Sequence, residues 1–114
     1  MNNINIRFEE IEKVKVENMR GGKGAIYLQK VKVAMPCKMY AKITLPKGSS
    51  IGLHTHIDDQ EIIYCLEGNA TLISDGVKSP FKKGDINVNF KNHEHSVIND
   101  SEDDVILLAV VTEA

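Results

Sequence analysis

Residues 48–68 decide the fold of this chain, and they read GSSIGLHTHIDDQEIIYCLEG. The stretch follows a turn signal at Pro46-Lys47-Gly48, continues as an extended segment to about residue 56, and turns at Asp58-Asp59. From Glu61 to Leu66 a β-branched and aromatic run resumes, which is typical of a strand. The stretch therefore predicts two strands joined by a short acidic turn.

The sequence outside this stretch also consists of short β-rich segments separated by turn signals. Met39 to Leu45 alternates apolar and polar residues, as a half-buried strand does. Asp75-Gly76 suits a two-residue hairpin loop between residues 69–74 and 77–81, because both residues tolerate positive φ. Further segments cover residues 86–90, 95–98 and 105–112. From Met35 onward this pattern predicts about seven or eight strands, and an all-β sandwich or barrel.

The first 24 residues are less regular. Phe8 to Ile11 suits a helical turn, whereas Ile11 to Val16 alternates apolar and charged residues like an edge strand. Met19 to Gly24 is glycine-rich but lacks the Gly-Lys-Ser/Thr ending of a phosphate loop, so a plain loop is favoured over an anion cradle. We expect an N-terminal arm with a possible first strand over residues 1–24, and a single barrel domain over residues 25–114.

Length and composition limit the classes of protein that the chain can represent. With 114 residues, 42% hydrophobic and 26% charged, it suits one globular domain. A net charge of −2 without a one-sided cluster of Lys and Arg argues against nucleic acid as a partner. Met1 to Glu10 is unlike a secretory signal, and the longest apolar run, Val105 to Val111, is too short to cross a membrane. We therefore expect a cytoplasmic protein without a membrane partner. Its two cysteines form no disulfide framework.

One group of polar residues indicates a metal site. His54 and His56 lie two apart in an extended segment, so their rings project from the same face. Glu61 begins the next strand, which we place beside the first in the same sheet, and a closed barrel brings His95 opposite these three. Three imidazoles and one carboxylate suit a divalent transition metal such as Mn, Fe, Ni or Zn better than Ca or Mg.

The same residues resemble the two motifs of the cupin superfamily. Gly48, His54, His56, Glu61 and Gly68 stand at the fixed positions of the first motif. Gly84, His95 and Asn99 stand at those of the second, where Phe90 and Asn92 replace a Pro and a Gly. This departure affects a turn, because Asn92 can adopt the left-handed conformation that glycine would supply. The resemblance spans Gly48 to Asn99, and the flanking strands fit the same fold.

The resemblance implies a small single-domain cupin. Its fold would be all-β, a double-stranded β-helix or jelly-roll barrel. Its metal ion would lie in the barrel mouth, bound by His54, His56, Glu61 and His95.

Four neighbouring residues have weaker claims to a role in this site. Gln60 lies beside Glu61 and faces the other way, so it is expected to point outward. His93 is expected in solvent, with a proton-carrier role as the minor alternative. Cys65 is expected to form apolar cavity wall, and Lys42 to face solvent or a partner rather than a ligand's carboxylate. Sequence alone assigns no second carboxylate or lysine to the cavity, which weakly favours oxygen chemistry or simple binding over proton shuttling.

Three functions fit the expected site, and fold does not choose among them. The first is a metal-dependent enzyme of dioxygenase or isomerase type, acting on a small oxygen-rich metabolite with catalytic residues unassigned. The alternative is a non-catalytic module that binds a sugar or small acid through the same metal, and the third is a barrel that its metal only stabilises. A homodimer is expected, because an open jelly roll of this size presents sheet edges and an apolar outer face.

Overall fold

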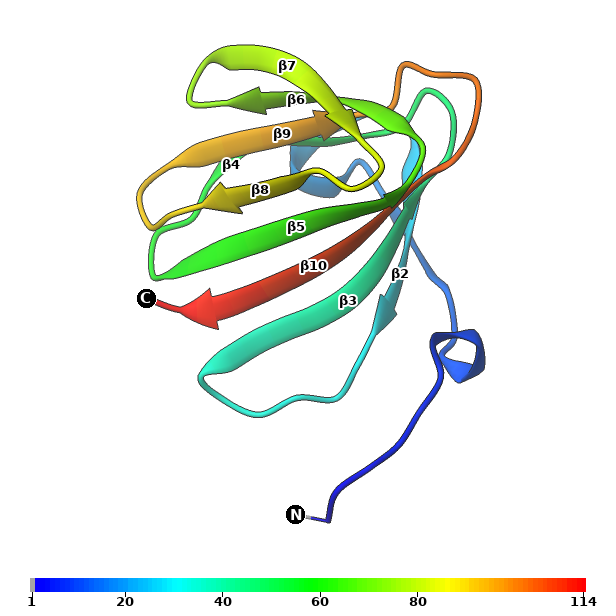
Figure 1. The fold of residues 1–114 in the computed structure, drawn as a ribbon, viewed down its shortest axis with the longest axis vertical. Helices are drawn as coiled ribbons and strands as arrows, with labels where there is room; N and C mark the ends of the chain where they lie inside the picture. The colour runs from blue at the N-terminus through cyan, green and yellow to red at the C-terminus, as the bar shows by residue number, and fades with distance from the viewer. Residues whose placement is uncertain (1) are drawn as a thin grey trace.

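The computed structural model describes residues 2–114, in which ten strands form two antiparallel sheets (Figure 1). Two short 3₁₀ turns, η1 (Phe8–Glu10) and η2 (Met19–Gly21), lie near the N-terminus. Met1, the first residue of the predicted arm, lies outside the described residues. The strands are β1 (Val14–Glu17), β2 (Ala25–Lys30), β3 (Cys37–Leu45), β4 (Ser50–Thr55), β5 (Asp59–Glu67), β6 (Asn69–Ser74), β7 (Val77–Lys82), β8 (Ile86–Asn89), β9 (Glu94–Ile98) and β10 (Val105–Glu113).

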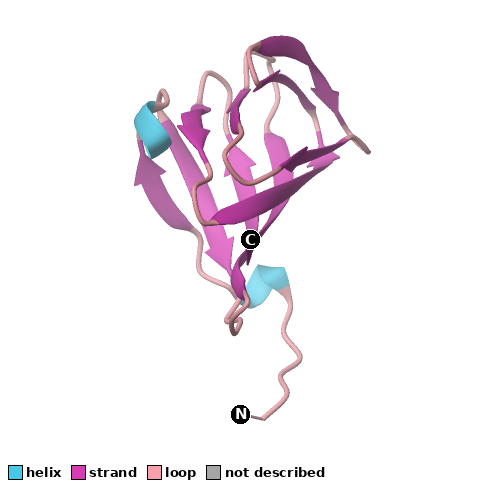
Figure 2. Cartoon of the chain, turned by 90° about the vertical axis from the view of Figure 1, so that its left-hand side faces the viewer, coloured by secondary structure: helices cyan, strands magenta, loops and turns pink. Residues whose placement is uncertain are grey.

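The two sheets face each other as the halves of a jelly-roll barrel (Figure 2). The six-stranded sheet has the order β1-β2-β3-β10-β5-β8, and the four-stranded sheet the order β4-β9-β6-β7. This confirms the predicted all-β double-stranded β-helix, and the described chain has eight strands from Met35 onward, as expected. No strand was predicted over residues 25–30, where β2 pairs with both β1 and β3.

Two turns have the backbone conformation that the sequence predicts. Asp75 and Gly76 have φ values of 47° and 80° and join β6 to β7, with Ser74 paired to Val77. Asn92 has a φ of 71°, so it replaces the motif's glycine in the left-handed region. The departure from the second cupin motif therefore leaves the turn before β9 intact.

The apolar core lies between the sheets, and the site lies at one end of it. Inward side chains from both sheets pack together, including Ile26, Ile43, Phe81, Val97 and Leu107, each at most 2% exposed. This packing supplies most of the driving force for folding. In the described part of the chain, no helix has the length and the hydrophobicity needed to cross a bilayer.

The N-terminal segment is attached to the outer face of the six-stranded sheet. Gln29 on β2 donates hydrogen bonds from Nε2 to the carbonyl oxygens of Phe8 (2.7 Å) and Ile11 (3.0 Å). The Phe8 ring stacks on Tyr40 of β3, and the preceding residues extend away from the barrel (Figure 2). The expected edge strand is β1, which begins and ends later in the sequence than predicted. The division at residue 24 stays a prediction.

Candidate metal centre

The four predicted ligands come from both sheets, in an arrangement that corrects two expectations. His54 on β4 and His95 on β9 are direct partners in one antiparallel pair, so His95 lies in the same sheet as His54 rather than across the barrel from it. Glu61 lies on β5, in the other sheet. The chain crosses from one sheet to the other at the turn after His56, so the expected pairing of the two strands around this turn is wrong.

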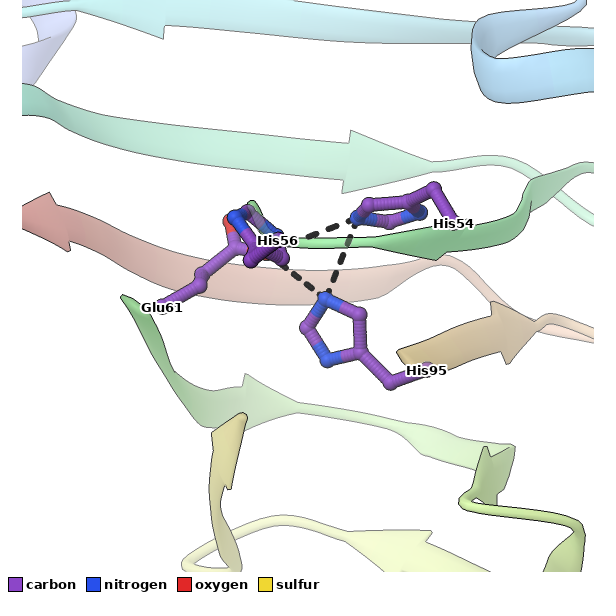
Figure 3. Close-up of side chains that lie close together, drawn as sticks. All are labelled: His54, His56, Glu61 and His95. Atoms are coloured by element: carbon purple, nitrogen blue, oxygen red, sulfur yellow. Dashed lines mark hydrogen bonds and ion pairs between the residues drawn. The ribbon is translucent and has the colours of Figure 1, made fainter. Parts of the chain in front are cut away.

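Their side chains converge on one point (Figure 3). Glu61 Oε1 lies 2.8 Å from His95 Nε2, 3.1 Å from His56 Nε2 and 3.8 Å from His54 Nε2. The Nε2 atoms of His54 and His95 are 3.1 Å apart. Two ligand atoms each about 2.1 Å from one ion, at an angle of roughly 90–110°, lie about 3.0–3.4 Å apart. The cluster therefore has the donors and the spacing to hold a metal ion.

Each imidazole is oriented by a separate acceptor at its other nitrogen. His54 Nδ1 donates to the Gly52 carbonyl oxygen (2.7 Å), and His56 Nδ1 donates to Asp59 Oδ1 (2.6 Å). His95 Nδ1 donates to the side-chain oxygen of Asn87 (2.9 Å). Protonation at Nδ1 leaves the lone pair of each Nε2 directed into the cluster, which is the tautomer that a metal-binding histidine needs.

The carboxylate and its neighbours polarise one another. Without a bound metal, burial would raise the pKa of Glu61, but hydrogen bonds that the three histidines donate when they are protonated at Nε2 outweigh it and hold that pKa well below its usual range. The hydrogen bond to Glu61 raises the pKa of His56; burial opposes this, and Asp59 adds to it. Glu61 is therefore ionised near neutral pH and available as an anionic ligand.

The cluster opens into a cavity of about 230 Å³ between the two sheets. One part of its wall is apolar, and the residues there are Met19, Met39, Ile43, Ile51, Ile63, Val97 and Val111. The rest of the wall includes three cationic residues, Arg20, Lys30 and Lys38, together with Asp59. Lys38 Nζ lies 3.0 Å from Asp59 Oδ2. Sequence alone assigned no second carboxylate or lysine to the cavity, and the structure places Lys30, Lys38 and Asp59 in its wall.

The four weaker candidates lie outside the cavity wall. Gln60 points away from it and donates to Thr112 Oγ1 (3.1 Å), as expected. The side chain of His93 is 53% exposed and pairs with Asp75, and Lys42 lies over the Phe8 ring on the outer face. Cys65 was expected in the cavity wall but is fully buried in the core. It shares the inward face with Glu61, yet it lies further from the barrel mouth, where core side chains fill the interior.

Several residues that surround the cluster were not predicted from the sequence. Asn87 lies inward on β8 because this strand alternates buried asparagines with exposed Ile86 and Val88, a pattern inverse to that of a normal strand. The inverted alternation was the available signal. Arg20 and Lys30 gave no signal of this kind, because nothing in their local sequence shows that η2 and β2 border the cavity.

Comparisons with known proteins agree with this fold. A family model of the cupin domain matches residues 41–111. The chain is 36% identical over 110 residues to a protein of Thermotoga maritima named oxalate-binding protein, covering 93% of this chain and 91% of that one. A crystal structure from the same organism, described as that of a predicted oxalate decarboxylase, matches with a TM-score of 0.94 and 32% identity over 97% of this chain and 100% of that one.

A more distant match concerns the architecture alone. The crystal structure of a sugar phosphate isomerase of the cupin superfamily from Silicibacter pomeroyi has a TM-score of 0.80 and 17% identity, covering 97% of this chain and 76% of that one. At this identity the likeness shows a shared fold, not a shared substrate.

Proposed function

This chain belongs to the cupin family, and on that basis we propose that it binds a small dicarboxylic acid, with oxalate as the best match, through a divalent transition metal ion. The proposed ligands of the ion are His54, His56, Glu61 and His95. From sequence alone an enzyme was favoured, and binding of a sugar or a small acid was the alternative. The name of the Thermotoga maritima relative supports the binding role.

The observation that carries this proposal is the charge of the cavity wall. A divalent ion and ionised Glu61 together have a net charge of about +1, which attracts an anion. Arg20, Lys30 and Lys38 add positive charge in the same wall, and Asp59 offsets one of them. An acid with two carboxylates matches this arrangement better than a neutral sugar does, because the positive charge of the ion and of the wall attracts an anion.

The size of the cavity supports a compact ligand. Pockets that bind drug-sized molecules are typically about 300–1,000 Å³, and this one is about 230 Å³. Oxalate has six non-hydrogen atoms, so a cavity of this size accommodates it. The apolar residues of the cavity wall, such as Met39 and Val111, would pack against the bound ligand and exclude water around it.

The metal ion would act as a Lewis acid that binds carboxylate oxygens of the ligand in its open coordination positions. The chain's own residues would position the metal ligands and orient the acid. The acceptors at Gly52, Asp59 and Asn87 hold the three imidazoles in place, and Glu61 neutralises part of the positive charge. The cationic wall residues attract and orient the acid.

Calorimetry with oxalate tests this function. Metal-loaded wild type is expected to show a single saturable binding event that is lost on removal of the metal with a chelator. His54→Ala should lose it as well, whereas His93→Ala should keep it, because His93 lies outside the cluster. Binding of oxalate to metal-free protein with unchanged affinity would overturn the role of the metal.

Turnover of the same acid is the second candidate function. It is favoured by Lys38 and Asp59, two titratable side chains that the structure places in the cavity wall beside His56. The Thermotoga maritima protein of known structure is described as a predicted oxalate decarboxylase. Release of carbon dioxide and formate from oxalate by metal-loaded protein would support turnover, and intact oxalate after prolonged incubation would support binding alone.

The expected homodimer is likewise a proposal, and exposed apolar side chains support it. On the outer face of the six-stranded sheet, Ile62 of β5 is paired with Val88 of β8, and Tyr64 with Ile86. Ile62 and Tyr64 are 38% exposed, Val88 is 39% exposed and Ile86 is 62% exposed. A contiguous apolar patch of this kind favours association with another protein surface.

A further inference from the structure

The turn over residues 18–22 is held tightly against β4, beside the metal cluster. A Cβ atom on Gly22 would overlap the carbonyl oxygen of Ser50, and one on Gly52 would overlap the carbonyl oxygen of Arg20. The backbone N–H of Lys23 donates to Ser50 Oγ, and the N–H of Ser50 donates to the Lys23 carbonyl oxygen, both at 2.9 Å. The turn is therefore a rigid part of the cavity rim.

Arg20 occupies an unfavourable backbone conformation in this turn, with φ 55° and ψ 31°. Among residues 2–114, the other non-glycine residues with positive φ are Asn18, Asp75 and Asn92, whose side chains tolerate the left-handed region. A glycine at position 20 would adopt the same conformation without steric penalty. Strained residues of this kind cluster at ligand-binding sites, where the side chain has a role that offsets the strain.

The charge of Arg20 is also available to a ligand. Lys38 is paired with Asp59 at 3.0 Å. Over the described residues, neither Arg20 nor Lys30 has a carboxylate oxygen within 4.0 Å of its side-chain nitrogen atoms. Of these two, the planar guanidinium of arginine can bind both oxygens of a carboxylate at once, which a lysine cannot do.

We propose that Arg20 is a specificity-determining residue that selects dianionic acids over monoanions of the same size. Its guanidinium binds the carboxylate oxygens that face the cavity rim when the acid is held at the cluster. This inference rests on the proposed function, because it needs a small acid in the cavity. It goes further by naming the residue that binds the second carboxylate of the acid.

The test compares two ligands and three variants of the full chain. Oxalate and oxamate have nearly the same shape, but oxamate has an amide in place of one carboxylate. Their affinities are measured by calorimetry for metal-loaded wild type, Arg20→Ala, Arg20→Gly and Arg7→Ala, and metal content is measured for each protein. Arg7 is the matched control, because it lies in the N-terminal segment with its side chain 76% exposed.

Arg20→Ala is expected to weaken oxalate binding by about tenfold or more while changing oxamate affinity by less than about twofold, because a charge-assisted hydrogen bond to a carboxylate is lost. Arg20→Gly should lose the same oxalate affinity and have a melting temperature equal to or above that of wild type. This separates a role in binding from a role in stability. Arg7→Ala should match wild type with both ligands.

Three results would overturn the inference alone, and the first two are equal losses for oxalate and oxamate in Arg20→Ala and unchanged oxalate affinity in that variant. A melting temperature of Arg20→Gly well below that of wild type would also do so, because it would make Arg20 a structural residue. If metal-loaded wild type binds neither ligand, the proposed function fails, and the inference fails with it.

Discussion

His54 and His95, which are 41 positions apart in sequence, lie directly opposite each other on adjacent antiparallel strands, with their Nε2 atoms 3.1 Å apart. Close cross-strand neighbours on one face of a sheet are in side-chain contact. The pair therefore does not depend on a flexible loop. It forms when β4 and β9 pair, so half of the cluster is built by the register of one sheet.

The first prediction concerns metal content. His54→Ala removes one of the four donors, so the bound metal is expected to fall from near one ion per chain to a small fraction, with affinity lower by on the order of 100-fold or more. Plasma mass spectrometry on untagged protein measures this. His93→Ala is the matched control and should retain wild-type metal. Equal metal in both variants would show that the ion lies elsewhere.

The second prediction concerns the support of His95 by Asn87. Asn87→Ala removes the acceptor for His95 Nδ1, so metal affinity is expected to drop by about 10- to 100-fold, the usual effect of losing such a partner. Asn87→Asp keeps an oxygen at this position and should restore most of the affinity. Competition with a chelator of known affinity measures both variants. The idea fails if Asn87→Ala binds metal as wild type does.

The third prediction concerns pH. A metal ion binds His56 only when its Nε2 is deprotonated, and the hydrogen bond to Glu61 raises the pKa of His56 above its ordinary value of about 6.5. Protons therefore compete with the metal up to a pH above that value, and metal affinity should rise with pH across this range.

The stability of the metal-free protein should change in the opposite direction. A raised folded-state pKa contributes stability that is complete below the unfolded-state pKa and is lost as pH rises through the folded-state value. The melting temperature of metal-loaded protein should therefore exceed that of metal-free protein by a margin that grows with pH. Thermal scans of both forms at several pH values measure the margin, and a constant margin would contradict this account.

The fourth prediction concerns the turn over residues 18–22, which is held against β4. Gly22→Ala would place a Cβ against the Ser50 carbonyl oxygen, so we expect a loss of about 3 kcal/mol or more in the free energy of unfolding, since backbone has to move. Gly21 has φ 78° and open space around it, so Gly21→Ala should cost only about 1–2 kcal/mol of left-handed strain. Urea unfolding compares the two. A smaller effect at Gly22 would mean that the turn is not held against β4.

The fifth prediction concerns association. Wild type is expected to sediment as a dimer, and Val88→Glu should shift it to monomer, because a charge on the apolar face of β5 and β8 has no partner when buried. Val77→Glu is the control, because Val77 is also an exposed valine but lies on the four-stranded sheet. A monomeric wild type, or equal effects of the two substitutions, would refute this interface.

Much of the fold followed from local patterns. Alternation predicted β3, the Asp75-Gly76 dipeptide predicted the β6–β7 hairpin, and the spacing of the histidines predicted that His54 and His56 share a face. The inverted alternation of β8 was present in the sequence but was not used. The site was predicted less completely, because Arg20 and Asn87 reach it from segments that are distant in sequence and carry no motif.

By itself, the sequence determined most of the strands, the turns that need positive φ, and the set of three histidines and one glutamate, because these depend on residue type and short-range spacing. Only the tertiary structure decided which strands that are distant in sequence are neighbours. That placed His95 beside His54, put Glu61 on the opposite sheet, and brought Arg20 and Lys38 into the cavity wall. The reason is physical: pairing between distant strands is set by the packing of two whole sheets around one core, which no local stretch encodes.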